Sequence, residues 1–309
     1  MKNIQNIGLL LFFVFSSYLS FAQTGTNDQS DLKNKLIELF PNAAISEIKN
    51  LEGYSESYQL ILDEPLDHKN PSKGTFKHYI YLSHFDFTRP MVIETHGYQT
   101  GNIKSEVSKL LNANQVAVEY RFYGKSRPTP IPWQYLTNDQ AIEDYHNITI
   151  KLKELYKGKW ISTGISKGGE TALIYKYKYP KDVDVAMPYV APLIDTQEDP
   201  RTTQHVKQVG TAECRAKVTH FQRALLTNRE ALLKEIKEHA VKEKMTFNEV
   251  SMEEALEYGA LEFPFSFWQW GGKCEDIPME GASSKVLFDY LNKIVGISFY
   301  NDQKFYELL

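Results

Sequence analysis

A serine lies in a short glycine-flanked motif that is typical of hydrolytic enzymes. Ser166 is flanked by Gly164 and Gly168, so the segment fits the pattern G-x-S-x-G. The surrounding pattern predicts a strand over 159–164 and a helix over 168–179. A sharp turn between such elements lifts the serine hydroxyl above the sheet edge, because small flanking residues leave room for the bend. The motif therefore predicts Ser166 as the nucleophile of a serine hydrolase.

Two backbone amides near this serine are expected to stabilise negative charge on a reacting carbonyl. The amide of Lys167 follows the nucleophile at a helix N-terminus, where N–H groups and the helix dipole favour an anion. The second amide usually comes from the loop after an earlier strand, and Tyr98 in the segment His96-Gly97-Tyr98 is the predicted donor. The alternative is that Gly97 only permits a tight turn. His96 precedes the nucleophile, and we expect it to be structural.

A charged segment follows another predicted strand at the same sheet edge. Residues 119–128 begin in that strand and run into a polar loop. Glu119 is a candidate to hold the amino terminus of a peptide, and Arg121 a candidate to hold a carboxylate. The alternative is an internal ion pair that stiffens the loop.

Strands and helices alternate along the part of the chain that carries these residues. Such alternation is typical of a mostly parallel sheet with helices on both faces, so the sequence predicts an α/β fold. Thr137 is a plausible N-cap for one helix. The expected strands are 58–62 and 75–84, which are antiparallel, and 91–95, 115–120, 159–164 and 183–190. The expected helices are 31–39, 103–111, 136–155 and 168–179.

The pattern changes after Pro192. Residues 211–258 have helical periodicity with charged outward faces, and 284–294 predict another helix. We therefore expect an α/β core over 23–192 and a helical cap over 193–309.

The N-terminus has the pattern of a signal peptide. Lys2 supplies a basic start, an apolar run covers 7–18, and Ser20-Phe21-Ala22 offers small residues for cleavage after Ala22. The alternative, a membrane anchor, is disfavoured because the run is shorter than the roughly 20 residues that span a bilayer. No later stretch is apolar enough to cross a membrane. Residues 1–22 therefore predict export to the periplasm or secretion.

The two cysteines and the charge balance limit the possible partners. In an oxidising compartment Cys214 and Cys274 can form a disulfide, which would close a loop of about 60 residues and stabilise by roughly 4 kcal/mol. Two buried free thiols are the alternative. Two cysteines without clustered histidines make no zinc site, and we expect no metal or cofactor. A net charge of -4 gives no electrostatic reason to expect nucleic acid. The oligomeric state is left open.

Several segments together carry a family resemblance. They are 119–128, 133–136, 140–141, 144–146, 158–164, 166–169, 179–180, 182–184 and 189–192. The chain resembles the bacterial secreted tripeptidyl aminopeptidases, which are prolyl tri- and tetrapeptidyl aminopeptidases of the α/β-hydrolase clan. The segment 119–126 is also similar to that of the lysosomal Pro-X carboxypeptidase group, whereas the lysine after Ser166 favours the aminopeptidases.

This resemblance implies a serine exopeptidase with a Ser-Asp-His triad. It would release short peptides from N-termini, often after proline, through an acyl-enzyme on Ser166. The substrate would be a peptide, and Cys214 and Cys274 look like the cap cysteines of that family.

The remaining triad members are not evident in the sequence. In this clan the chain order is Ser, Asp, His, with the last two after later strands. The histidines that follow Ser166 are His205, His220 and His239. All three lie in the predicted helical cap, and none follows a predicted strand. Residues 302–309 have a helical pattern that lacks a signal for the end of the helix. We therefore expect that the sheet lacks its last strands, and that this chain, without the triad Asp and His, is nearly inactive alone.

Two alternatives use the same serine motif differently. One is a secreted esterase or lipase, because G-x-S-x-G does not separate ester from amide chemistry. The charges of 119–128 favour a peptide over an ester. The other is a non-catalytic pseudo-hydrolase that keeps the cleft.

Overall fold

The computed structural model describes residues 29–304. The predicted signal peptide, residues 1–22, and the end of the chain from 305 lie outside the described residues. Between 29 and 304, no helix combines the length and apolar character needed to cross a membrane.

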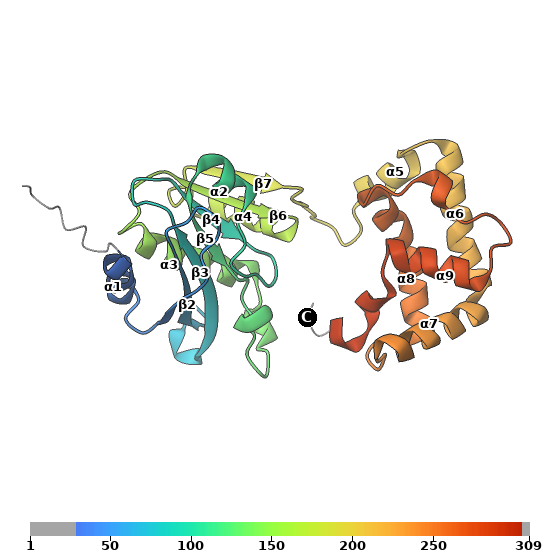
Figure 1. The fold of residues 1–309 in the computed structure, drawn as a ribbon, viewed down its shortest axis with the longest axis horizontal. Coiled ribbons are helices and arrows are strands. Elements are labelled where there is room, and N and C mark those ends of the chain that lie inside the picture. Colours follow the sequence, from blue (N-terminus) through green and yellow to red (C-terminus); the bar gives the residue numbers. More distant parts are fainter. Residues whose placement is uncertain (1–28, 305–309) are drawn as a thin grey trace, which may run out of the picture.

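Seven strands of the described chain form one mixed sheet in the order β1-β2-β3-β5-β4-β6-β7. Pairing is antiparallel from β1 through β3 to β5, and parallel among β5, β4, β6 and β7 (Figure 1). Together with the intervening helices, this arrangement confirms the predicted α/β fold class. The strands are β1 (Ala44–Glu47), β2 (Glu56–Pro65), β3 (Thr75–His84), β4 (Met91–Thr95), β5 (Asn114–Val118), β6 (Trp160–Ile165) and β7 (Val185–Tyr189).

Helices cover both faces of the parallel part because alternate strand residues point to opposite sides. Ile93 of β4 belongs to a large core that also contains residues of α1, α3 and α4. Its neighbour Val92 packs instead with Val107 of α2 on the other face. Thr137 caps α3, since its side chain accepts a hydrogen bond from the amide of Gln140. These helices are α1 (Gln29–Leu39), α2 (Glu106–Leu111), α3 (Asn138–Leu152) and α4 (Lys167–Lys178).

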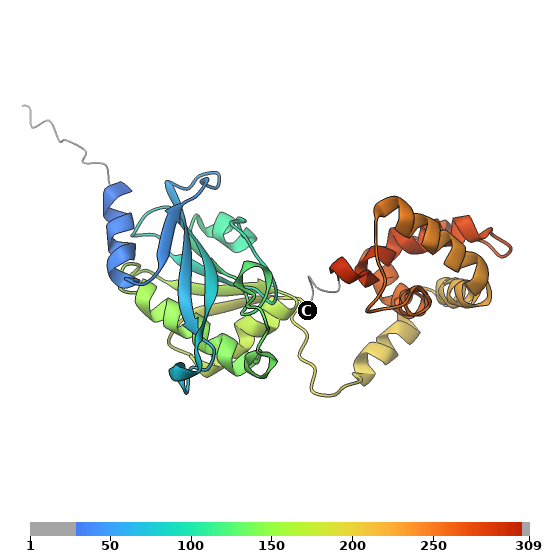
Figure 2. The same ribbon diagram turned by 90° about the horizontal axis from the view of Figure 1, so that it is seen from below.

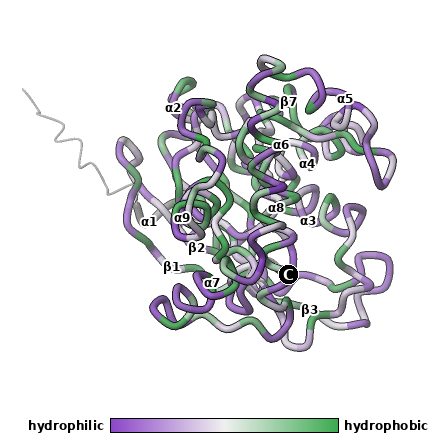
Figure 3. Tube along the Cα trace, turned by 90° about the vertical axis from the view of Figure 1, so that its right-hand side faces the viewer, coloured by the Kyte–Doolittle hydropathy of each residue, from purple (hydrophilic) through white to green (hydrophobic). Residues whose placement is uncertain are grey.

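The remaining helices lie to one side of the sheet and follow an extended segment after β7 (Figures 1 and 2). All of them except the first, Pro200–Gln208, contribute to a second hydrophobic core built from their own apolar faces. Hydrophilic and hydrophobic stretches are interleaved along their traces in Figure 3, as expected for helices with one buried face. They are α5 (Pro200–Gln208), α6 (Ala212–Thr227), α7 (Arg229–Glu243), α8 (Met252–Gln269) and α9 (Ser284–Ile294).

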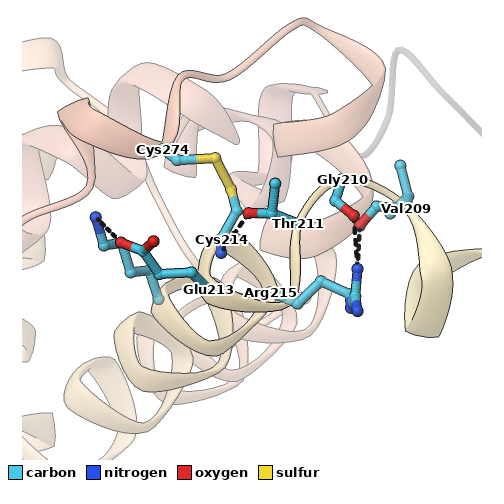
Figure 4. The surroundings of a disulfide bond; sticks show 8 residues. Val209, Gly210, Thr211, Glu213, Cys214, Arg215 and Cys274 are labelled. Atoms are coloured by element: carbon cyan, nitrogen blue, oxygen red, sulfur yellow. Dashed lines mark hydrogen bonds and ion pairs between the residues drawn. A yellow bond between two sulfur atoms is a disulfide. The ribbon is translucent and has the colours of Figure 1, made fainter.

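A disulfide joins two parts of this helical region. Cys214 of α6 bonds to Cys274, and their Cα atoms are 5.5 Å apart (Figure 4). The side chain of Thr211 caps α6 by accepting a hydrogen bond from the amide of Cys214. The predicted bridge is therefore present, and the alternative of free thiols is wrong. The bridge links α6 to the short 3₁₀ helix that follows α8, Cys274–Asp276.

Most element predictions are confirmed, with two omissions. The strands at 75–84 and 91–95 and the helix at 284–294 match the structure residue for residue. The helical stretch 211–258 is divided, because Asn228 separates α6 from α7 and a left-handed Lys244 ends α7. Two elements have no pattern in the sequence that predicts them: β1, which has only four residues and is mostly exposed, and α5, in which no residue is buried. Neither offers the alternation of burial on which pattern reading depends.

A carboxylate near the end of the described chain provides a pH test of the helical region. Asp302 accepts hydrogen bonds from the amides of Glu249 and Asn248, at 3.0 and 2.7 Å, and these bonds lower its pKa to about 2. Because the folded-state pKa lies below the unfolded value, the stabilisation is present above about pH 4 and disappears as the pH falls to about 2. Asp302→Asn should therefore be less stable than the native chain at pH 6 but not at pH 2. Urea unfolding at several pH values measures this, with Asp289→Asn in an exposed pair with Lys285 as the control. A difference that stays constant with pH would contradict it.

Candidate functional site

Ser166 stands at a strained turn between β6 and α4. Its backbone has φ 56° and ψ −124°, a conformation that residues with a side chain rarely adopt. The turn is held by a hydrogen bond from the Ser166 amide to the carbonyl of Tyr189, at 2.9 Å. The residue is exposed, so the turn presents its hydroxyl at the protein surface. This is the strand–turn–helix geometry that the G-x-S-x-G motif predicts.

The two glycines of the motif allow this turn to pack directly on β4. A Cβ atom on Gly164 would lie 2.3 Å from the carbonyl oxygen of Gly168 and 2.4 Å from that of Thr95. A Cβ on Gly168 would also lie 2.4 Å from the Thr95 oxygen. The hydroxyl of Thr95 donates to the Gly168 carbonyl at 2.8 Å. Small residues are therefore required on both sides of Ser166 because backbone from another strand occupies the space.

The structure brings the loop after β4 against the same turn. A Cβ on Gly97 would lie 2.5 Å from the Cβ of Lys167, so the two segments are in contact. The next residue, Tyr98, accepts a hydrogen bond through its carbonyl from the amide of Tyr120, at 3.1 Å. Ser166, Lys167 and Tyr98 thus lie on adjoining segments, as the sequence analysis expects. Their assignment as nucleophile and oxyanion donors stays a prediction.

Glu119 is buried and bonded within the protein. One carboxylate oxygen accepts from the amide and hydroxyl of Ser126, at 2.8 and 2.7 Å, and the other from the amide of Thr100, at 3.2 Å. Burial raises the pKa of Glu119, and the bonds from Ser126 only partly offset this. The carboxylate therefore ties two loops near the site together, and its contact with a substrate stays a prediction.

Arg121 is also buried, and its guanidinium makes an internal ion pair. It donates to both oxygens of Asp144, each at 2.8 Å, and it also donates to three backbone carbonyls. These carbonyls belong to Pro65, Leu66 and Tyr135. Burial alone would raise the pKa of Asp144, but the guanidinium outweighs it and holds that pKa below its usual value. The geometry is that of the internal alternative, and substrate contact by Arg121 stays a prediction.

The same region contains three buried groups that resemble metal ligands in type. Potential ligand atoms of Glu64, His78 and Asp144 lie within 4.8 Å of one another. However, Asp144 already has Arg121 as its cation, and the imidazole of His68 lies 2.6 Å from one of its oxygens. Burial and the neighbouring Asp144 raise the pKa of Glu64 well above its usual value, so this carboxyl tends to keep its proton. The cluster is better suited to a balanced charge network than to an added dication.

No histidine of the described chain hydrogen-bonds to Ser166, whose hydroxyl has no partner between residues 29 and 304. His96 lies 2.9 Å from the hydroxyl of Thr100 and 3.6 Å from a Glu94 oxygen, as a structural residue would. The other candidates lie in the helical region. His205 and His220 are exposed on α5 and α6, and His239 packs against Phe288.

Comparisons with known proteins point to a peptidase family. A sequence profile described as PS-10 peptidase S37 matches residues 26–308. A prolyl tri/tetrapeptidyl aminopeptidase from Streptomyces mobaraensis is 34% identical over 284 residues, which cover 90% of this chain and 59% of the relative. Prolyl carboxy peptidase like protein 5 from Caenorhabditis elegans is 28% identical over 165 residues, covering 45% of this chain and 31% of the relative.

Among solved structures, proline iminopeptidase from Mycobacterium smegmatis has a TM-score of 0.36 at 12% identity, covering 59% of this chain and 55% of that chain. A structural similarity of this size gives no information about the activity of this chain. The chain spans 59% of the length of the Streptomyces relative.

Proposed function

Because this chain belongs to the peptidase S37 family, we propose that it acts in peptide hydrolysis as a serine exopeptidase that releases tri- and tetrapeptides from N-termini, with cleavage after proline. The 34% identity to a prolyl tri/tetrapeptidyl aminopeptidase supports the substrate class. The observation that carries the proposal is the strained, exposed Ser166 at the start of α4. An ordinary surface serine has no need of positive φ.

In this mechanism the Ser166 hydroxyl attacks the scissile carbonyl and forms an acyl-enzyme. As the Oγ–C bond forms, the carbonyl oxygen gains negative charge, which the amides of Lys167 and Tyr98 would stabilise. The released amine takes up a proton, and water then hydrolyses the ester on Ser166. Removing the hydroxyl proton requires a base beside the serine.

We further propose that a polypeptide limited to these 309 residues is nearly inactive. The support is that the Ser166 hydroxyl has no hydrogen-bond partner within residues 29–304. Without a base, a serine peptidase keeps only the contribution of its oxyanion site and binding, about 10³-fold over water. Turnover should then lie far below the roughly 1 s⁻¹ of an ordinary enzyme.

Export and domain division are part of the same proposal. The Cys214–Cys274 bridge supports an oxidising compartment, hence periplasm or secretion after removal of residues 1–22. Two separate hydrophobic cores support an α/β core over 23–192 and a helical cap over 193–309.

An esterase at the same serine is the second candidate. The carboxylate of Glu119 is hydrogen-bonded to Ser126 and the guanidinium of Arg121 is paired with Asp144, so these charges no longer favour a peptide over an ester. Comparing p-nitrophenyl esters with fluorogenic X-X-Pro amides separates the two activities.

Covalent labelling tests the role of Ser166. We expect a fluorophosphonate to modify the purified chain slowly at Ser166, and Ser166→Ala to abolish the modification. Intact-mass measurement and peptide mapping detect it, and Ser72→Ala at an exposed turn is the matched control. Equal labelling of the Ser166→Ala variant would rule out this nucleophile. Turnover of about 1 s⁻¹ or more on an X-X-Pro amide would show instead that the chain contains its own base.

A further inference from the structure

The side chain of Lys167 lies among three tyrosine rings beside the candidate nucleophile. Its ammonium nitrogen is 4.0 Å from the ring centroid of Tyr120, 4.8 Å from that of Tyr123 and 5.0 Å from that of Tyr98. All three distances fall within the range of cation–π attraction. Two of the rings come from the segment after β5, and the third comes from the loop after β4.

The ring faces take the place of a carboxylate partner. Lys167 forms no salt bridge with any residue between 29 and 304, although the lysine is partly buried. Burial lowers the pKa of its ammonium, and Glu170 acts in the opposite direction. An ammonium held by neutral rings is stabilised without being neutralised, so the contact depends on the charge of the side chain.

The three rings also connect the loop after β4 to the rest of the site. The ring of Tyr98 packs edge-on against that of Tyr123, at 5.4 Å between centroids, and Tyr123 packs in the same way on Tyr120. The backbone of Tyr98 accepts the amide hydrogen bond of Tyr120. Lys167 therefore contacts this loop twice, through its Cβ at Gly97 and through its ammonium at the Tyr98 ring.

We propose that Lys167 is a positioning residue of the oxyanion site, whose ammonium braces the loop after β4 and so fixes the amide of Tyr98. The proposal rests on the proposed function of Ser166. One residue then has two tasks: its amide is a donor, and its side chain places the second donor. The accuracy of such placement matters because a donor must lie within about 2.7–3.1 Å of the developing oxyanion.

Hydrogen exchange of the loop tests the brace without requiring catalysis. Lys167→Met keeps the length of the side chain and removes its charge. We expect the amides of residues 97–101 to exchange about tenfold faster in this variant, because the loop opens more often. Lys151→Met is the matched control. The Lys151 ammonium also lies near a ring, 5.0 Å from the centroid of Phe40, but neither residue belongs to the loop after β4 or to the turn at Ser166. Unchanged exchange at 97–101 in Lys167→Met would overturn the proposal.

Labelling kinetics then separate positioning from a merely structural role. Under saturating fluorophosphonate, Lys167→Met should lower the maximal labelling rate about tenfold with little change in the half-saturating concentration, and Lys167→Arg should recover most of the rate. A Lys167→Arg variant as slow as Lys167→Met would count against a charge-dependent brace. If the native chain is not labelled at Ser166, the proposed function fails. Amide exchange at residues 97–101 then tests by itself whether the Lys167 ammonium holds the loop after β4.

Discussion

Replacing Arg121 with methionine should lower the free energy of unfolding by about 3–5 kcal/mol. The substitution leaves the carboxylate of Asp144 buried, at 1% exposure, without its cation. Three backbone carbonyls lose a donor as well. Breaking a buried pair from one side is costly because the remaining charge cannot return to water, and the imidazole of His68 contacts only one of its two oxygens. Urea unfolding followed by circular dichroism measures the loss.

The chain offers a matched control in Arg201. Its guanidinium also pairs with a carboxylate, that of Asp199, but its side chain is 69% exposed. Arg201→Met should change stability by less than about 1 kcal/mol, because water replaces a lost surface partner. Equal effects of the two substitutions would mean that Arg121 is not a structural residue, and its role in substrate binding would regain support.

Gly164→Ala should destabilise the chain by about 3 kcal/mol and abolish labelling of Ser166. The added Cβ would lie 2.3 Å from the Gly168 oxygen and 2.4 Å from the Thr95 oxygen, both backbone atoms that cannot rotate away. Overpacking of this kind costs about 1–3 kcal/mol or more, because the backbone itself must shift. The shift would move the turn and with it the hydroxyl of Ser166. Thermal unfolding and intact-mass labelling report the two effects separately.

Gly101→Ala is the matched control for this change. A Cβ at Gly101 meets nothing within 4 Å, although the residue lies in the loop that follows β4. We expect native stability and native labelling in that variant. If Gly164→Ala also behaved like the native chain, the packing of the turn against β4 would not be what holds Ser166 in place.

Local patterns in the sequence were enough to predict the turn that carries Ser166. The glycines at 164 and 168, the apolar strand before them and the helix after them are neighbours in the chain. Steric limits on φ and ψ act over only a few residues, so such a segment specifies its own geometry. Local patterns also predict β3 from alternating polar and apolar residues, α9 from helical periodicity and β4 from a short continuous apolar run.

The surroundings of this turn were decided only by the tertiary structure. The sequence predicts Glu119 and Arg121 as possible contacts for a peptide, yet the structure pairs Arg121 with Asp144, which is 23 residues away in the chain. The rings around Lys167 likewise come from positions 98, 120 and 123. The sequence determined which residues carry charge and where the chain bends. Packing determined which charges stay exposed, because the burial of a side chain depends on distant segments that no local period encodes.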